Sequence, residues 1–314
     1  MKSLLRNLGL GRVLLALYHR PVGRARDSLR NGGPFAERET ERQRLEMVRA
    51  ADGLGALPQW PGAPTLTVHL MTGRRFWYQT LFCLHSLSRT SAVNVVAEIY
   101  DDGTIDDRCR ERLLRLGPVR IHGIAELTAR RDAGLPPDRF PCLRDRWEKY
   151  PNIRKLIDVH LGSQGWKLVI DSDLLFFAPA TELLAWQADP RQPLVATDCE
   201  ESYGYSRPLM ESLAGGSLPA LVNVGLCGLN SSELDWGQLE SWTAELQRRE
   251  RTNYYLEQAL VAMLLPGRAF TQVSAERYIT RPTRQQVQSG AGVMQHYVAE
   301  SKRWYFRQGW RSFV

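Results

Sequence analysis

The feature that most constrains the fold of this 314-residue chain is an apolar run that stops at two aspartates. Residues Lys167–Ile170 have the pattern of a buried strand, Asp171 and Asp173 follow directly, and a second apolar run resumes at Leu174. Burying two carboxylates this close together costs free energy unless a cation or hydrogen-bond donors meet them. Hard divalent cations such as Mg²⁺ or Mn²⁺ take oxygen ligands and share their coordination shell with substrate phosphates. A second interpretation, in which the two acids only cap the strand and turn the chain, fits the tripeptide equally well.

Strand and helix patterns alternate on both sides of this motif. We expect strands at Leu66–Met71, Val93–Tyr100, Val119–His122, Leu194–Thr197 and Leu221–Leu229, with further short ones near Thr271 and Val293. We expect helices at Arg74–Ser88, Ile105–Leu116, Pro151–Leu161, Glu233–Arg249 and Tyr254–Leu264. Such alternation is typical of an α/β fold with a mostly parallel central sheet covered on both faces. Ligands in such sheets bind at the carboxyl ends of the strands, where Asp101-Asp102 and the two aspartates are predicted to lie.

Charge and cysteine content limit which kinds of partner and which cellular compartment fit the sequence. The formal charge is +7, and only five of the 41 basic residues are lysines. The arginines are scattered, so a phosphorylated substrate or an anionic membrane surface accounts for the charge, and we expect no nucleic-acid partner. The five cysteines lack metal-ligand spacing and predict buried free thiols in a reducing, cytoplasmic compartment. No apolar run reaches the length of a membrane span.

Residues 1–62 are predicted to form an N-terminal helical extension and linker, ahead of an α/β domain at residues 63–314. Met1–Arg20 is basic and amphipathic, and Arg12 interrupts what would otherwise resemble a signal-peptide core. Two interpretations stay open: a helix on the inner, anionic face of a membrane, or a helix packed on the main domain. Ala36–Ala51 has the pattern of a charged, solvent-facing helix, and Gly53–Pro64 that of a linker.

Three further motifs follow the two aspartates along the chain. They are Asn223-Val224-Gly225 in a predicted strand, Glu257-Gln258 at the start of a helical run, and His296-Tyr297 followed by Lys302 and Trp304. The glycine of the first motif allows a substrate or another part of the backbone to approach the strand closely. Each motif alone is weak evidence, and the four in this order are more specific.

With these motifs, the chain resembles the family 8 glycosyltransferases, which have the GT-A fold, a Rossmann-like fold of nucleotide-diphospho-sugar transferases. That family has an Asp-x-Asp after a strand, a basic residue on the preceding helix, Asn-x-Gly, an acid-Gln pair and a late His-aromatic-x-Gly-x-x-Lys-Pro-Trp. The chain keeps the histidine, aromatic residue, lysine and tryptophan of the last motif. It departs at Ala299, where the family has Gly, and at Arg303, where it has Pro. The resemblance extends from Thr65 to Trp304.

The resemblance implies a metal site with Asp171, Asp173 and His296 as ligands of Mn²⁺ or Mg²⁺. Lys302 would add positive charge beside the diphosphate of a nucleotide-sugar donor, which Asp171 would also help to bind through the metal. Asn223 would contact the sugar hydroxyls, Gln258 would contact the sugar or the acceptor, and both would form the catalytic group with Asp173. For both amides, a purely structural role in the sheet is the competing interpretation.

The resemblance also implies further contacts to the donor. Either Arg154 or Lys155 would be the basic residue of the preceding helix, unless the two are only a solvated charge pair. Asp102 would bind the nucleotide base or ribose, although Asp-Asp-Gly-Thr also suits a plain turn. Arg75, at the carboxyl end of the first predicted strand, would reach the donor phosphates.

The sequence therefore predicts a metal-dependent glycosyltransferase that moves a sugar from a nucleotide-diphosphate donor, with UDP-sugar expected, to a glycan, lipid-linked or protein acceptor. Retention of the anomeric configuration is the expected stereochemistry. The alternative is a non-catalytic nucleotide-sugar or membrane-surface binding protein on the same scaffold, which the changes at Ala299 and Arg303 keep open. A nucleotidyltransferase or phosphatase is disfavoured because the chain has neither a Gly-rich phosphate loop nor an early nucleophilic aspartate.

Overall fold

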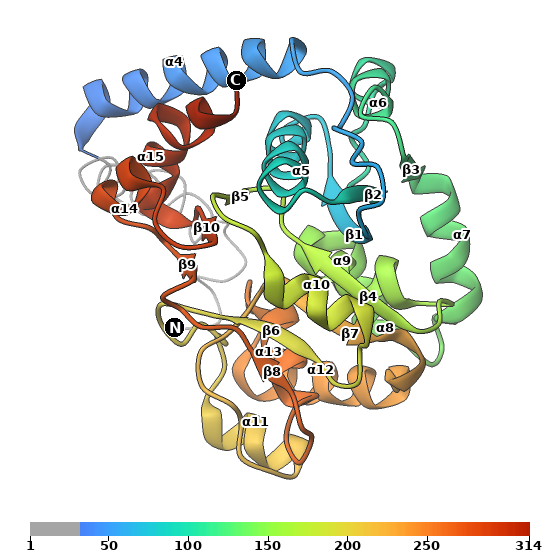
Figure 1. The fold of residues 1–314 in the computed structure, drawn as a ribbon. Coiled ribbons are helices and arrows are strands. Elements are labelled where there is room, and N and C mark those ends of the chain that lie inside the picture. The colour runs from blue at the N-terminus through green and yellow to red at the C-terminus, as the bar shows by residue number, and fades with distance from the viewer. Residues whose placement is uncertain (1–31) are drawn as a thin grey trace, which may run out of the picture.

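The computed structural model describes residues 32–314, in which strands and helices alternate (Figure 1). The strands are β1 (Thr65–Thr72), β2 (Asn94–Asp101), β3 (Val119–His122), β4 (Trp166–Ile170), β5 (Leu174–Phe176), β6 (Leu194–Thr197), β7 (Val222–Asn230), β8 (Thr271–Gln272), β9 (Tyr278–Thr280) and β10 (Met294–His296). The α-helices are α4 (Gly33–Asp52), α5 (Trp77–Ser91), α6 (Asp107–Leu114), α7 (Ile124–Gly134), α8 (Pro141–Lys149), α9 (Pro151–His160), α10 (Thr181–Ala188), α11 (Arg207–Ala214), α12 (Trp236–Glu250), α13 (Leu256–Met263), α14 (Arg284–Ser289) and α15 (Lys302–Arg307). Three short 3₁₀ helices are η2 (Ser231–Glu233), η3 (Ala299–Ser301) and η4 (Gly309–Phe313).

The central sheet has seven strands in the order β3-β2-β1-β4-β7-β6-β8. Strands β3, β2, β1 and β4 are mutually parallel, β7 runs antiparallel to both β4 and β6, and β6 is parallel to β8. The prediction of a mostly parallel central sheet is confirmed. A second sheet of three strands, in the order β5-β10-β9, stands beside it and carries the C-terminal part of the chain.

Alternating side chains of the sheet build two separate apolar layers. On β4, Leu168 and Ile170 join the layer formed with α5, β5 and the C-terminal helices. Val169, between them, faces the opposite layer, which α8, α9, α12 and α13 cover. A strand buried on both faces reads as a continuous apolar run, which is why this segment has no polar residue between Leu168 and Asp171.

Capping explains where the observed helices differ from the predicted ones. The predicted helix at Glu233–Arg249 begins instead at Trp236, because the Asp235 side chain accepts a hydrogen bond from the Gln238 backbone N–H at 3.0 Å. The predicted helix at Arg74–Ser88 begins at Trp77, after a turn in which the Gly73 carbonyl accepts from the backbone N–H groups of residues 76 and 77.

Helix α4 confirms the predicted helix within the N-terminal extension, but it is not solvent-facing all round. It lies along α15, from the other end of the described chain (Figure 1). Met47 and Ala51 are fully buried, and Arg307 donates a hydrogen bond to the Ala36 carbonyl at 2.9 Å. The predicted linker is also packed, since Leu57 is buried and its N–H donates to the Leu116 carbonyl at 2.9 Å.

Two predictions about the N-terminal region receive no structural test. The basic amphipathic segment Met1–Arg20 lies outside the described residues, and the domain boundary at residue 62 stays a prediction. Within residues 32–314, none of the helices combines the length and the apolar character needed to cross a bilayer.

Candidate functional site

The two aspartates of the apolar run lie at the carboxyl end of β4, in the turn that leads to β5. The Asp171 N–H donates to the Gly225 carbonyl at 2.8 Å, which ties the turn to the neighbouring strand β7. Strand β5 then pairs antiparallel with β10, so that Leu174 stands opposite His296. This pairing brings an imidazole from near the end of the chain to the aspartates in its middle.

The three residues that the sequence predicts as metal ligands come together. The His296 Nε2 atom lies 3.6 Å from Asp171 Oδ2 and 3.4 Å from Asp173 Oδ1. One ligand atom from each residue falls within 4.8 Å of the others. Two ligands about 2.0–2.1 Å from one ion, at angles of about 90–120°, stand roughly 2.8–3.6 Å apart. The two distances from the imidazole therefore suit one divalent cation shared with both carboxylates.

Each aspartate uses its other oxygen to bind a lysine. The Lys155 ammonium donates to Asp171 Oδ1 at 2.7 Å, and the Lys302 ammonium donates to Asp173 Oδ2. Burial alone would raise the pKa of Asp173, but Lys302 and His296 outweigh burial and hold that pKa well below its usual range. Lys302 and His296 thus keep Asp173 charged, and each aspartate has one oxygen facing the imidazole.

Glu257 is the second acid beside Lys155. The Lys155 Nζ atom lies 3.5 Å from Glu257 Oε2, and both side chains are buried. Burial raises the pKa of Glu257 to about 8, because Lys155 offsets only part of the desolvation and the charge of Asp171 adds to it. Burial lowers the pKa of Lys155, but Asp171 and Glu257 outweigh it and the net shift is upward. Lys155 therefore stays cationic between two acids.

The surroundings of Gly225 explain why the Asn-x-Gly motif has a glycine at this position. A Cβ atom at this position would lie 2.3 Å from His296 Cε1 and 2.9 Å from Asn223 Oδ1, well inside van der Waals contact. The bare backbone N–H instead donates to Asn223 Oδ1 at 2.9 Å. The glycine is thus needed for the imidazole to approach the strand.

Asp198 is a member of this site that the sequence analysis missed. Its Oδ2 atom accepts hydrogen bonds from Asn223 Nδ2 at 3.0 Å and from Gln258 Nε2 at 3.1 Å. Its Oδ1 atom accepts from the Cys199 N–H at 2.8 Å. The signal was present, since Asp198 follows β6 as Asp171 follows β4, but a single acid after a short strand is common. Asp198 holds both predicted amide side chains in place.

These residues line a cleft with two connected arms. The larger arm, of about 410 Å³, is lined by Asn223, Gln258, Glu257 and His296 among others. The smaller arm, of about 230 Å³, is lined by Asp102 together with Thr72, Phe76 and Gln79 of the β1–α5 region. Residues common to both arms are Asn152, Lys155, Asp171, Asp173, Tyr254 and Lys302. The two predicted aspartate ligands therefore stand at the junction of the arms, and His296 lies on the side of the larger arm.

Two predicted donor-binding residues lie outside both arms. Arg154 is buried and donates to the carbonyls of Asp101 and Asp102, at 2.6 and 2.7 Å, so it fixes the end of β2 rather than facing the cleft. Arg75 lines a neighbouring hollow of about 640 Å³ next to α4, which Lys302 also borders. Of the two basic candidates on α9, the structure brings only Lys155 into the cleft.

The backbone next to the site is strained at Ala299, which has a φ of +47°. The family that the sequence resembles has glycine at this position, and glycine adopts a left-handed φ without a steric cost. The His-Tyr-Val-Ala segment thus keeps the glycine-like turn despite the methyl group, and Lys302 reaches Asp173 after it.

Comparisons with known proteins place the fold. No family model matches the chain, and no curated protein sequence matches it. Among solved structures, the galactosyltransferase LgtC in complex with donor and acceptor sugar analogues is similar, with a TM-score of 0.51, 12% identity, and coverage of 74% of this chain and 87% of that one. Mouse xyloside xylosyltransferase 1 is similar with a TM-score of 0.50 and 15% identity, over 74% and 97% of the two chains. The bifunctional glycosyltransferase WbbM has a TM-score of 0.50 and 12% identity, over 82% of this chain and 52% of that one.

These similarities confirm the predicted GT-A fold. At 12–15% identity they establish the arrangement of the chain and not its chemistry. What this chain does must be argued from its own cleft.

Proposed function

We propose that the protein is a metal-dependent glycosyltransferase that takes a sugar from a nucleotide-diphosphate donor, with UDP-sugar as the first candidate. The observation that carries the proposal is the convergence of Asp171, Asp173 and His296 between a buried lysine, Lys155, and a half-buried one, Lys302, in a two-armed cleft. Oxygen and imidazole ligands beside fixed positive charges suit a divalent ion shared with a diphosphate. The glycosyltransferases among the structural neighbours support the same activity class.

The donor would lie across the junction. Its diphosphate would meet Lys302 and the metal, its nucleoside would enter the smaller arm, and its sugar would enter the larger one. In the smaller arm, Asp102 offers a carboxylate for ribose hydroxyls, with one oxygen already held by the Thr104 N–H at 2.9 Å. In the larger arm, Asn223 and Gln258 offer amides that Asp198 orients.

The reaction needs stabilisation of the leaving group above all. The bond between the anomeric carbon and the diphosphate oxygen breaks, and the acceptor oxygen bonds to that carbon. The acceptor proton passes to the departing diphosphate. The Lys302 ammonium would stabilise the negative charge that develops on the leaving oxygen. The metal, when bound, supplies Lewis-acid charge to the same diphosphate.

Retention of configuration is part of the proposal. An inverting reaction needs a general base to take the acceptor proton, and an unpaired carboxylate in the larger arm would be one candidate. Five carboxylates line the larger arm: Asp171, Asp173, Asp198, Glu200 and Glu257. Glu200 pairs with Arg281 at 3.0 Å, and the other four are engaged by the neighbours described above. With none of them free among the described residues, proton transfer to the departing phosphate is the simpler route.

Two exposed aromatic rings support a saccharide acceptor. Tyr254 and Tyr255 border the larger arm, are 60% and 42% exposed, and stand edge to face at 5.2 Å. Exposed tyrosine rings offer an apolar face for stacking and a hydroxyl for hydrogen bonding. A lipid or protein carrying the glycan, and a position on the inner face of a membrane, stay predictions from the sequence.

The experiment is a donor screen with Mn²⁺ and a panel of nucleotide sugars, following the release of nucleoside diphosphate. Turnover or slow hydrolysis with at least one donor is expected, and Asp173→Asn should lower it by at least about 100-fold. The matched control is Asp189→Asn, which changes an exposed aspartate paired with Arg191. No release with any donor would contradict the proposal.

Calorimetry separates the enzyme from a binding protein on the same scaffold. Metal-dependent binding of a uridine diphosphate sugar without any turnover would favour the binding protein. Loss of that binding in the Asp173 variant is expected under both hypotheses.

A further inference from the structure

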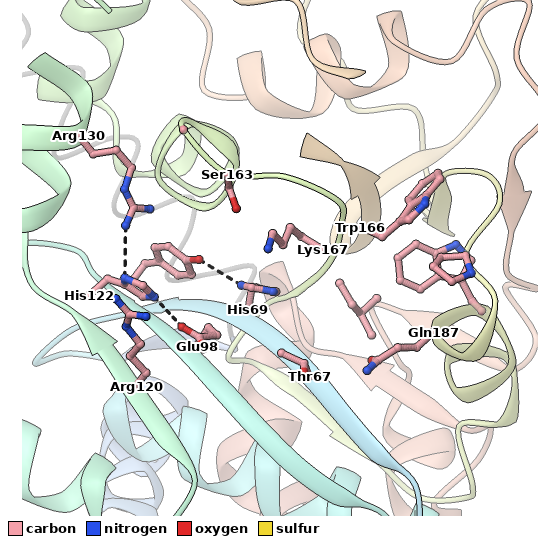
Figure 2. Close-up of a pocket in the computed structure, with 15 residues that line it drawn as sticks. Thr67, His69, Glu98, Arg120, His122, Arg130, Ser163, Trp166, Lys167 and Gln187 are labelled. Atoms are coloured by element: carbon pink, nitrogen blue, oxygen red, sulfur yellow. Dashed lines mark hydrogen bonds and ion pairs between the residues drawn. The ribbon is translucent and has the colours of Figure 1, made fainter. Parts of the chain in front are cut away.

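Another hollow, distinct from the one beside Arg75, lies on the face of the central sheet and shares no lining residue with the cleft. It has a volume of about 640 Å³ and crosses four parallel strands, β3, β2, β1 and β4. Figure 2 shows its residues, which come from these strands, from α7, from the loop after α9 and from α10. Because the site-bearing ends of β1 and β4 lie further along each strand, the hollow is separate from the metal centre.

The sequence of the strands makes this part of the sheet polar. On β1, Thr67 and His69 point into the hollow, whereas Leu66, Val68 and Leu70 between and beside them are fully buried in the apolar layer on the other face. Strands β2 and β3 repeat the pattern with further polar or charged residues facing the hollow: Glu98, Tyr100, Arg120 and His122. A mostly parallel sheet is ordinarily apolar on both faces, so a polar row across four strands calls for an explanation.

His69 gives the strongest sign of a ligand. It is only 5% exposed, and its Nδ1 atom lies 3.1 Å from the Tyr100 hydroxyl. Burial, with Lys167 and His122 nearby, lowers the pKa of His69 to about 3, so the ring is neutral. Burial raises the pKa of Tyr100, which keeps its proton and can donate it to Nδ1. The Nε2 atom then carries a hydrogen and has no protein partner within residues 32–314.

Lys167 places a positive charge near this imidazole. Lys167 forms no ion pair with any of the described residues, and Figure 2 shows its side chain and that of Ser163 directed toward the same space as His69. Arg120 stands at the rim, with a side chain that is 66% exposed and 3.8 Å from Glu126. Arg130 and His122, in contrast, are held by Glu126 at 2.7 and 2.9 Å. The free donors are therefore Lys167, His69 Nε2 and Ser163, with Arg120 nearby.

The other end of the hollow is aromatic. Trp166 packs edge to face against Trp186 at 5.6 Å, and Trp186 is anchored by a hydrogen bond from its Nε1 to the Gln192 carbonyl at 2.7 Å. Gln187 and Thr67 lie between the two ends (Figure 2). A fixed aromatic ring beside amide and hydroxyl groups suits a sugar, which has an apolar face and hydroxyls along its edge.

A metal ion does not fit this hollow. Of the described residues, only Asp171, Asp173 and His296 gather as three acidic, histidine or cysteine ligands around one point. His122 is already held between Glu98 and Glu126, at 2.6 and 2.9 Å, and His69 lies on a different strand with a lysine beside it. The free groups are hydrogen-bond donors, which favour an anion.

We propose that this hollow binds a sugar phosphate at a site separate from the cleft. The phosphate meets Lys167, His69 Nε2 and Ser163, and the sugar ring lies toward Trp166. Glu98 keeps one oxygen on His122 and has the other to accept a sugar hydroxyl. The site gives the protein a second point of contact with a phosphorylated saccharide and does not depend on the reaction in the cleft.

The test follows the imidazole resonances of His69 by NMR while glucose 1-phosphate is added in EDTA, which removes divalent metal from the cleft. Saturable shifts of the His69 signals are expected, with the signals identified by their loss in His69→Gln. Lys167→Gln should weaken binding by at least about 10-fold, since it removes a charge-assisted hydrogen bond. Lys149→Gln is the matched control, because Lys149 is an exposed lysine of α8 paired with Asp145. Circular dichroism confirms that each variant is folded.

Two further measurements test which ligand binds and where it binds. Asp173→Asn should leave the His69 shifts unchanged, and inorganic phosphate and uridine monophosphate should both bind more weakly than the sugar phosphate. Shifts that do not saturate, or an affinity for glucose 1-phosphate that is unchanged in Lys167→Gln, would overturn the site. Equal weakening by Lys149→Gln would overturn it as well. Equal or tighter binding of inorganic phosphate or uridine monophosphate would overturn the sugar assignment.

Discussion

The substitution Gly225→Ala tests how the site is held together without changing any predicted ligand. The added Cβ would lie 2.3 Å from His296 Cε1, 2.7 Å from His296 Nδ1 and 2.9 Å from Asn223 Oδ1. Carbon atoms in contact lie about 3.5–4.0 Å apart, so the ring must retreat by more than about 1 Å. Strand β7 is held at this point from the β4 side, where the Asp171 N–H donates to the Gly225 carbonyl at 2.8 Å, and its pairing with β6 resumes at Asn223 and Cys227 on either side.

A shift of this size is large for a metal ligand. Disturbing the groups that only orient a ligand costs about 10–100-fold in metal affinity. Moving the imidazole itself should cost at least about 100-fold, or about 2.7 kcal/mol of binding free energy. Overpacking should also lower the free energy of unfolding by about 1–3 kcal/mol.

The assay is calorimetric titration of Mn²⁺ into the wild type and the variant, with urea unfolding of both. Gly55→Ala is the matched control, since a Cβ at Gly55 meets no heavy atom within 4 Å. Gly225→Ala with Mn²⁺ affinity within about threefold of the wild type would refute the reasoning about how His296 is placed.

Three further substitutions test other parts of the account. Asp198 accepts hydrogen bonds from the amides of Asn223 and Gln258, and Asp198→Asn would set a third amide donor against one of them. The free energy of unfolding in urea should fall by about 1–3 kcal/mol, and an unchanged value would contradict the role of Asp198. Glu257 holds its proton up to about pH 8 when folded but only to about pH 4.5 when unfolded, so its contribution to stability is full below pH 4.5 and is lost as the pH rises through 8. The melting temperature of Glu257→Gln should therefore rise relative to the wild type between pH 5 and pH 8, and a constant difference would contradict this. Ala299→Gly relieves a left-handed alanine at about 1–2 kcal/mol but adds unfolded-state entropy, so a net gain of up to about 1 kcal/mol is expected; a clear loss of stability would contradict the strain at Ala299.

The aspartates of the site could be predicted from the sequence because they follow directly after a strand pattern. Asp171 follows an apolar run, and the ends of neighbouring strands meet at one edge of a sheet. His296 was predicted through the spacing to Lys302, and the β5–β10 pairing confirms that it reaches the aspartates. Sequence alone does not show which strands of the small second sheet pair, so the contact had to rest on the family resemblance.

Other features depend on directions that a sequence pattern does not fix. Arg154 and Lys155 are adjacent on α9, and neighbouring helical residues point about 100° apart. One therefore faces the cleft and the other faces the end of β2. The burial of α4 was missed because few apolar residues such as Met47 interrupt its charged surface, and its partner α15 lies at the far end of the chain.

The central claim is that one divalent ion bridges the middle and the end of this polypeptide. Pulsed electron paramagnetic resonance of Mn²⁺ added to the protein tests it directly, because nitrogen within bonding distance of the ion modulates the spin echo. The account predicts one tightly bound Mn²⁺ per chain with the coupling of a single imidazole nitrogen, and loss of that coupling in His296→Gln. A bound ion without nitrogen coupling, or a coupling that survives in His296→Gln, would contradict it.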